Sequence, residues 1–230
     1  MTSGTPDNEC RLIAIGDVHG HPKALRGLVE LVGLRPDDVV VMLGDYVNRG
    51  PDSRGVIEFL IELGARCQLV PLLGNHDEMM LGSRGDVNAE SRWRYEGGTA
   101  VLRQYGPRNS VEDVSKSHWD FLASCQPAHE TDAFIFVHAN YSWYDSVEHQ
   151  PSSLLRWISI DEEKPQPHTS GKTVILGHTP GPIRDYGFCR CLDTGCGFGG
   201  RLTAMDVFTK TCWQVTEDGE AVEPEPVATV

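Results

Sequence analysis

The chain has 230 residues, of which 40% are hydrophobic and 23% are charged, and its formal net charge is −13 at pH 7. This length fits one domain with a sizeable core, and the acidic excess argues against nucleic acid or an anionic membrane as a partner. No apolar run could cross a bilayer and the N-terminus lacks the features of a signal peptide, so we expect a cytoplasmic protein.

The first half of the chain alternates short apolar runs with amphipathic segments. Residues 10–16, 39–43 and 67–73 are apolar runs of strand length, and the first of them ends in glycine. Residues 21–32 and 56–63 carry apolar side chains at helical spacing, and each segment is followed by glycine. Strands that alternate with helices predict a largely parallel sheet with right-handed crossovers.

The second half of the chain has a different pattern. Residues 78–131 are mostly helical in pattern, residues 145–172 are rich in Pro, Ser and Glu and predict an exposed loop, and residues 217–230 predict a flexible tail. One domain would then span residues 1–216. Five short apolar runs predict a second sheet packed on the first, with helices outside. These runs are residues 134–137, 174–176, 189–192, 202–207 and 211–215.

The seven cysteines are odd in number and scattered, which is typical of reduced thiols. Cys189, Cys191 and Cys196 lie close together in the sequence, but their spacing matches no zinc pattern with a fourth ligand. Small residues on strands and turns are the favoured interpretation of this group.

Polar residues, most of them beside glycine, follow five of the predicted strands. In open α/β sheets, ligands bind at the carboxyl ends of the strands, so five strand ends that deliver Asp, Asn or His to one edge predict a metal site. A single such residue is more often a turn residue or a helix cap, and the agreement of five decides for the site. The segments are Gly16-Asp17-Val18-His19-Gly20, Gly44-Asp45-Tyr46-Val47-Asn48-Arg49-Gly50, Gly74-Asn75-His76-Asp77, His138 and Gly177-His178-Thr179.

This ordered series resembles the phosphoprotein phosphatase family of metallophosphoesterases, and the resemblance covers nearly the whole chain. The segment Asp193-Thr194-Gly195-Cys196, with the glycines that follow it, is similar to the bacterial branch, which holds small protein-phosphatase-like enzymes and symmetrical diadenosine tetraphosphatases. The resemblance implies that residues 1–216 form a calcineurin-like metallophosphoesterase domain. Its fold would be an α/β (α+β) sandwich of two sheets between helices, αββα, in agreement with the two-sheet pattern.

The resemblance also implies a set of metal ligands by matched position. Asp17 and His19 would bind one divalent ion, and Asp45 would bridge it to a second. A bridging carboxylate holds two cations about 3.5–4 Å apart, and the cations acidify the water between them, so that hydroxide attacks phosphorus in line. Nitrogen and oxygen ligands suit Mn²⁺, which we expect, and also Fe or Zn²⁺. The ligands of the second ion would be Asn75, His138 and His178.

Further residues would bind the phosphoryl group. Arg49 offers a flat fork of donors for the phosphoryl oxygens, beside Asn75. Arg156 is the nearest match to a second phosphate-binding arginine of the family, and a surface arginine packed beside Trp157 is the alternative.

His76 would be the general acid that protonates the leaving group. In the family an aspartate of the second loop orients this ring, and the matched position here is Asn48. An amide carbonyl can still accept the ring proton, but it cannot stabilise an imidazolium as a carboxylate does, so the pKa of His76 should be lower.

The sequence therefore predicts a dimetal phosphoesterase that acts on phosphomonoesters, with phosphoserine or phosphothreonine in proteins as the leading substrate and small phosphoesters also possible. A symmetrical dinucleoside tetraphosphatase is the alternative enzyme, although the region after Glu78 predicts too small an insertion to grip a nucleotide. A catalytically weakened phosphate-binding protein is the third hypothesis, because of Asn48.

Overall fold

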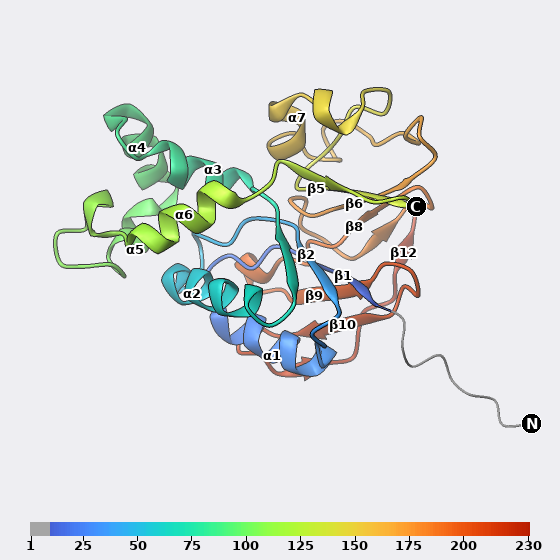
Figure 1. Cartoon of the computed structure of the whole chain (residues 1–230), viewed down its shortest axis with the longest axis horizontal. Coiled ribbons are helices and arrows are strands. Elements are labelled where there is room, and N and C mark those ends of the chain that lie inside the picture. The colour runs from blue at the N-terminus through green and yellow to red at the C-terminus, as the bar shows by residue number, and fades with distance from the viewer. Residues whose placement is uncertain (1–9) are drawn as a thin grey trace, which may run out of the picture.

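The structure, a computed structural model, describes residues 10–230 and consists of two six-stranded sheets stacked face to face with helices outside (Figure 1). This arrangement confirms the predicted αββα sandwich. The predicted start of the domain at residue 1 and the features of the N-terminus lie outside the described residues.

The first sheet has the strand order β11-β10-β9-β1-β2-β3. Three parallel strands form one half of it, as the alternating pattern predicts, and α1 and α2 cover its outer face. The other half is antiparallel. The elements are β1 (Leu12–Ile15), α1 (Pro22–Val32), β2 (Val39–Met42), α2 (Ser53–Gly64), β3 (Gln68–Pro71), β9 (Leu202–Asp206), β10 (Cys212–Val215) and β11 (Ala221–Val222).

The second sheet has the strand order β12-β7-β8-β6-β5-β4. Strands β5, β6 and β8 run parallel in its centre, and α7 (Ser152–Arg156) lies beyond its outer face. The strands are β4 (Ala128–Glu130), β5 (Phe134–Val137), β6 (Thr173–Leu176), β7 (Arg184–Asp185), β8 (Cys189–Cys191) and β12 (Ala228–Thr229).

Alternate residues of the central strands serve different cores. Ile13 and Ile15 of β1 pack under the helices, whereas Ala14 faces the second sheet together with Phe136 and Ile175 of β5 and β6. Because successive side chains point to opposite faces, strands buried on both faces are apolar throughout, which is the pattern found in the sequence.

The sequence placed residues 202–207 and 211–215 in the second sheet, and this assignment was wrong. Strand β9 pairs antiparallel with β1, with Ile13 opposite Asp206, and β10 pairs with β9. An apolar run indicates that a strand is buried, but it does not indicate which strand it pairs with.

The region after β3 is mostly helical, as predicted, and forms an insertion that projects from one end of the sandwich (Figure 1). Its last residues differ from the prediction, because they form β4 at the edge of the second sheet. The helical elements are α3 (Asn75–Gly82), α4 (Val87–Trp93), a π-helical turn (Arg94–Gly98), α5 (Thr99–Leu102), a 3₁₀ turn (Val111–Asp113) and α6 (Lys116–Ser124).

Two segments predicted as irregular contain regular structure. Residues 145–172 include a 3₁₀ turn (Val147–His149) and α7, whose Leu155 is buried. In residues 217–230, β11 pairs with β10 and β12 pairs with β7, although the boundary of the domain at residue 216 stays a prediction. No helix within residues 10–230 combines the length and the apolar character needed to cross a membrane.

Candidate metal centre and active site

The residues predicted to bind metal come together at one edge of the sandwich, where β1, β2, β3, β5 and β6 end. The two sheets are stacked so that the carboxyl ends of these strands meet, which brings residues more than 100 positions apart into one cluster. All of them are buried except His178, which is half-buried. The cluster contains Asp17, His19, Asp45, Asn75, His138 and His178.

The hydrogen bonds of two histidines fix which ring nitrogen is free. Nδ1 of His138 lies 2.7 Å from the carbonyl oxygen of Leu43, and Nε2 of His178 lies 3.2 Å from that of Trp157. Because a carbonyl oxygen only accepts, each of these nitrogens is the donor, and each neutral ring keeps a lone pair on its other nitrogen. These two lone-pair nitrogens face each other at 3.2 Å.

Oxygen atoms of Asn75 and Asp45 also lie close to these two nitrogens. Nε2 of His138 lies 3.1 Å from Oδ1 of Asn75 and 3.6 Å from Oδ1 of Asp45. On the other side of Asp45, Nδ1 of His19 donates to the carbonyl of Val47 at 3.0 Å, which leaves Nε2 of His19 facing Oδ2 of Asp45 at 3.4 Å. Asp45 therefore belongs to two groups of donor atoms, one with His19 and His76 and the other with His138 and His178, and the atoms of each group lie within 4.8 Å of one another.

Burial favours the metal-binding state of these rings. It lowers the pKa of His19 to about 3, with a further contribution from His76, and it lowers the pKa values of His138 and His178. The rings are therefore neutral at pH 7, which is the form that binds a metal ion.

Burial has the opposite effect on the pKa values of the carboxylates in the site, because it disfavours their charged form. Burial, and then the charge of Asp193, raise the pKa of Asp17 well above its usual range, and burial and the charge of Asp77 do the same for Asp45. Repulsion between buried carboxylates is relieved by protonation or by a cation between them. Lone-pair nitrogens, an amide oxygen and two unbalanced carboxylates around one centre fit a pair of divalent ions.

Backbone strain is concentrated in this region. Of the seven non-glycine residues with positive φ among residues 10–230, five belong to the site, from +44° at His19 to +69° at Asn48. Left-handed backbone is uncommon for residues other than glycine, although Asn, Asp and His adopt it more readily than most, and its concentration at one place is typical of functional sites. Gly74 allows the loop after β3 to pass close to Asp45, because a Cβ at this position would collide with the Asp45 carboxylate.

Arg49 and His76 lie beside the metal cluster. Nη2 of Arg49 is 3.4 Å from Nε2 of His76, and the guanidinium carbon lies 4.1 Å above the ring of Phe198, which is exposed. Burial and then the charge of Arg49 lower the pKa of His76 to about 4. Phe198 was not identified as a site residue from the sequence, although an aromatic residue among Gly195, Gly197, Gly199 and Gly200 was a possible signal.

Asn48 does not orient His76, contrary to the prediction. Its Oδ1 accepts a hydrogen bond from Nε1 of Trp93 at 3.0 Å, and its Nδ2 donates to the carbonyl of Glu96 at 3.1 Å. Nδ1 of His76 is buried without a hydrogen-bond partner. The amide of Asn48 therefore connects the loop after β2 to the helical insertion, a contact that local sequence could not reveal because 45 positions separate the partners.

Arg156 is not a surface residue, and its side chain is committed to an ion pair. Its Nη2 lies 2.6 Å from Oε1 of Glu78, and its Nε donates to the same oxygen at 2.9 Å. Trp157 donates from Nε1 to Oε2 of Glu78 at 2.7 Å. The structure thus places Arg156 and Trp157 side by side, as one interpretation of the sequence had it, but through a carboxylate that was not identified.

Two further carboxylates were quoted in the sequence motifs without a role. Oδ1 of Asp77 accepts from the backbone N–H of Tyr46 at 3.0 Å and Oδ2 accepts from that of Gly74 at 3.1 Å, so Asp77 joins the second and third loops. Asp193 accepts from the N–H of Gly195 at 2.9 Å, and burial raises its pKa to about 6. Their position in the motifs was the only signal available.

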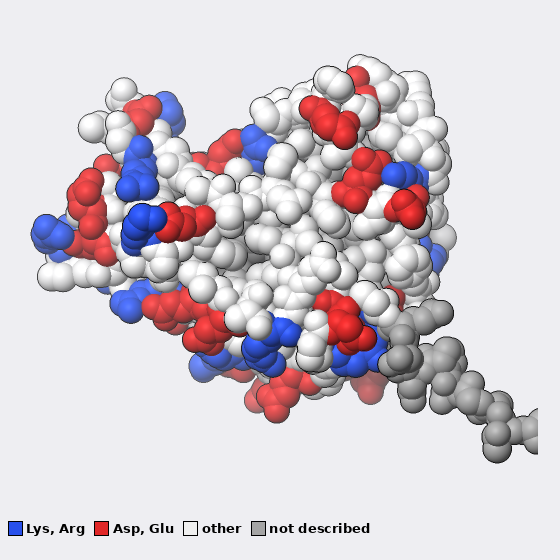
Figure 2. Space-filling model, viewed as in Figure 1, with Lys and Arg blue, Asp and Glu red and all other residues white. Residues whose placement is uncertain are grey.

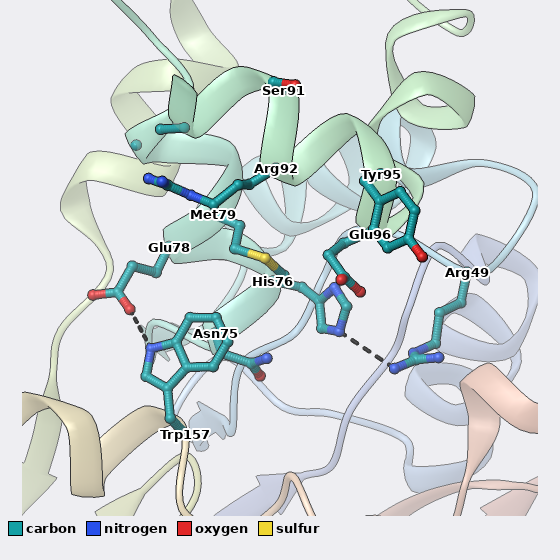
Figure 3. A pocket seen from close by; sticks show the side chains of 12 residues that line it. Arg49, Asn75, His76, Glu78, Met79, Ser91, Arg92, Tyr95, Glu96 and Trp157 are labelled. Atoms are coloured by element: carbon teal, nitrogen blue, oxygen red, sulfur yellow. Dashed lines mark hydrogen bonds between the residues drawn. The ribbon is translucent and has the colours of Figure 1, made fainter. Parts of the chain in front are cut away.

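A cavity of about 860 Å³ opens beside this cluster, between the insertion and the segment after α7. It is lined by Arg49, Asn75 and His76 on the side of the site and by Tyr95 of the insertion and Trp157 on its other walls (Figure 3). Figure 2 shows the corresponding notch between the two parts of the molecule. This volume is within the range of small-molecule sites, and it exceeds what a phosphoryl group alone needs.

The fold and the buried donor set define a metal-dependent hydrolase of phosphoric esters. The chain belongs to the calcineurin-like phosphoesterase family, whose profile matches residues 10–206.

Two curated relatives carry different names. A symmetrical bis(5′-nucleosyl)-tetraphosphatase of Methylococcus capsulatus is 28% identical, over 84% of this chain and 90% of its own. Serine/threonine-protein phosphatase 1 of Salmonella typhimurium is 27% identical, over 82% and 88%. Among solved structures, a candidate diadenosine tetraphosphatase superimposes with a TM-score of 0.69 at 22% identity, over 92% of this chain and 96% of its own.

Proposed function

We propose that this protein is a symmetrical dinucleoside tetraphosphatase, which adds one water to diadenosine tetraphosphate and breaks the central P–O–P linkage to give two molecules of ADP. The observation that carries the proposal is the cavity of about 860 Å³ beside Arg49, Asn75 and His76. It argues against the expectation that the region after Glu78 leaves too little room for a nucleotide. The relative from Methylococcus capsulatus, which bears this name and is matched over 90% of its length, supports the same choice.

The proposed site uses two divalent ions, which supply charge neutralisation for the phosphoryl oxygens and activation of the attacking water. Asp17 and His19 would hold one ion and Asp45 would bridge the two. We expect Mn²⁺, with Fe or Zn²⁺ as alternatives. The remaining ligands in this proposal are Asn75, His138 and His178.

Arg49 is placed to neutralise phosphoryl oxygens, because its guanidinium is held by Phe198 and faces His76 at the edge of the cavity. His76 remains the candidate acid, but no carboxylate orients its ring and its Nδ1 has no partner. An imidazole held in this way is a weak general acid. A nucleoside diphosphate leaves far more easily than a serine alkoxide, so this geometry favours a phosphoanhydride over a phosphomonoester.

A serine/threonine protein phosphatase is the second candidate, favoured by the relative from Salmonella typhimurium. Its substrates would be phosphorylated proteins. A weakened phosphate-binding protein is the third, and it depends on the missing carboxylate at position 48. The cytoplasmic location, and the lack of nucleic-acid and membrane partners, stay predictions from the sequence.

The experiment is a comparison of substrates with protein loaded with Mn²⁺. We expect diadenosine tetraphosphate to be turned over with a kcat/KM at least about 100-fold above that for a phosphoserine peptide, and chromatography should show ADP as the product. Equal or faster turnover of the phosphopeptide would favour the second candidate. Turnover of neither substrate would favour the third.

A further inference from the structure

Trp157 is an exposed aromatic residue at the wall of the cavity, and two hydrogen bonds hold it there. The residue as a whole is 41% exposed. Its indole N–H donates to Oε2 of Glu78 at 2.7 Å, and its backbone carbonyl accepts from Nε2 of His178 at 3.2 Å. The residue is thus attached directly to a predicted metal ligand, while its ring lines the cavity beside Asn75 (Figure 3).

The acceptor that holds the ring is itself fixed. Both Nε and Nη2 of Arg156 contact Oε1 of Glu78, at 2.9 and 2.6 Å, and the Arg156 side chain is only 10% exposed. This leaves Oε2 of Glu78 for the indole. The contacts of Arg156 and Trp157 with Glu78 connect the C-terminal end of α7 to α3, so the orientation of the ring is set before any ligand arrives. Such preorganisation lowers the entropy that binding would otherwise cost.

We propose that Trp157 is a stacking platform for a nucleobase, and that Glu78 and Arg156 are its positioning residues. The assignment rests on the proposed function, which supplies a substrate with a flat base attached to the phosphate chain. Stacking of a base on an aromatic ring needs an exposed face, and the bond from the indole N–H to Glu78 leaves the ring system free to offer one. Because Trp157 is hydrogen-bonded to His178, a predicted metal ligand, the platform lies directly beside the centre where the phosphoryl group would bind.

The proposal gives Arg156 a role different from that of a phosphate clamp, and the two roles have different consequences. A clamp would act on any phosphate ligand, whether or not it carries a base. A positioning residue for Trp157 would act only on ligands that have a base. ADP and inorganic pyrophosphate share the diphosphate group and differ in the adenosine, so they separate the two cases.

The test measures competitive inhibition constants of ADP and pyrophosphate against hydrolysis of p-nitrophenyl phosphate by the Mn²⁺-loaded protein. Trp157→Leu should raise the constant for ADP by roughly 5- to 100-fold, the range for loss of one base–aromatic stack, and change that for pyrophosphate by less than about 2-fold. Trp157→Phe should recover most of the ADP affinity, because it keeps a ring. Arg156→Met should raise the constant for ADP and not that for pyrophosphate.

The matched control is Trp143→Leu. Trp143 is 46% exposed, close to the value for Trp157, and belongs to the same connection between β5 and β6, but it does not line the cavity. This variant should leave both inhibition constants unchanged. As a direct readout, ADP should quench tryptophan fluorescence in the parent protein and in Trp143→Phe, and the quenching should be lost in Trp157→Phe.

Equal effects of Trp157→Leu on both ligands, or no effect on either, would overturn the platform. An equal rise of both constants in Arg156→Met would restore the clamp and remove its positioning role. These outcomes are separate from the proposed function, which fails if the parent protein releases no ADP from diadenosine tetraphosphate, whatever the variants do.

Discussion

Asp45 is the residue on which both halves of the proposed metal centre depend. One carboxylate oxygen faces His138 at 3.6 Å and the other faces His19 at 3.4 Å, while the N–H of His76 donates to the first at 2.9 Å. Replacement by Asn nearly preserves the side-chain volume and removes the charge that two ions would share at the proposed centre.

We expect Asp45→Asn to lower metal affinity by more than the roughly 10–100-fold that loss of an outer hydrogen-bond partner costs, and to lower the rate with it. Metal content after gel filtration and kcat measure both effects. The control is Asp120→Asn, because Asp120 is an exposed carboxylate on α6 that pairs with Lys116. Unchanged metal content in Asp45→Asn would mean that this residue does not bridge two ions.

Asn48 gives a second prediction at the same scale. A carboxylate at this position would set a negative oxygen against the carbonyl of Glu96, now 3.1 Å from the amide nitrogen. Asn48→Asp should therefore lower the free energy of unfolding by about 1–3 kcal/mol, the usual cost of a buried polar group without its partner. Denaturant titration measures it, with Asn109→Asp as control, since Asn109 also has positive φ. A large gain in rate on phosphoserine instead would show that the new carboxylate orients His76.

The donor residues of the site could be predicted from their places after strands, because parallel strands bring their carboxyl ends to one edge. Contacts such as those of Asn48 with Trp93 and of Glu78 with Arg156 could not, since their partners are 45 and 78 positions away. A side chain's chemistry limits what it can bind, but only the packed chain determines which partner it meets.

Among the elements, the helical insertion depends on one glycine. A Cβ at Gly98 would collide with the ring of Trp93, which is fully buried and bonded to Asn48. Gly98→Ala should lower the free energy of unfolding by about 1–3 kcal/mol, as overpacking of a core does. Gly82→Ala on α3 has no atom within 4 Å of the new Cβ and should be neutral or slightly stabilising. A neutral Gly98→Ala would mean that the insertion adapts freely around Trp93.

The connection between α1 and the first sheet is stabilised by a buried ion pair. Asp38, directly before β2, accepts from Nε of Arg11 at 3.0 Å and from the N–H of Arg35 at 2.7 Å. Burial raises the pKa of Asp38, but the hydrogen bonds and charges of Arg11 and Arg35 outweigh it, and the pKa is lower than usual. The folded state therefore binds the proton less tightly than the unfolded chain does.

The ionised Asp38 therefore makes its full contribution to stability above the pKa of about 4 that it has in the unfolded chain. This contribution is lost as the pH falls through its lower pKa in the folded state. Asp38→Asn should cost about 1–3 kcal/mol at pH 7, and the difference from the parent should shrink as the pH falls below about 4. Unfolding measured across this range tests it. A difference that is constant with pH would mean that the charge of Asp38 does not contribute.

Element type was predicted well where the apolar period was long enough to be distinctive, as in α1, α2 and the central strands. It failed where an element has few residues, as in α7 with five and β12 with two, because so few positions show no period. The pairing of β9 with β1 was missed for another reason, since strand order depends on the path of the whole chain.

At the scale of the whole molecule, the excess of acidic residues does not prevent the binding of an anionic substrate. On the face in Figure 2, basic and acidic side chains alternate along the lower edge, and no broad basic area is visible. The charge that matters is local. Arg49 and Arg92 line the cavity together with Glu78 and Glu96, and two divalent ions at the proposed centre would add positive charge on the side of the metal cluster.

The central claim is that the cluster around Asp45 holds two divalent ions on which hydrolysis of a dinucleoside tetraphosphate depends. The most direct measurement is a titration of Mn²⁺ into chelated, desalted protein, in which bound metal and the release of ADP from diadenosine tetraphosphate are followed together. We predict almost no release without metal, and activity that rises until two ions are bound per chain. Full activity in the metal-free protein, or saturation of binding without any release of ADP, would contradict it.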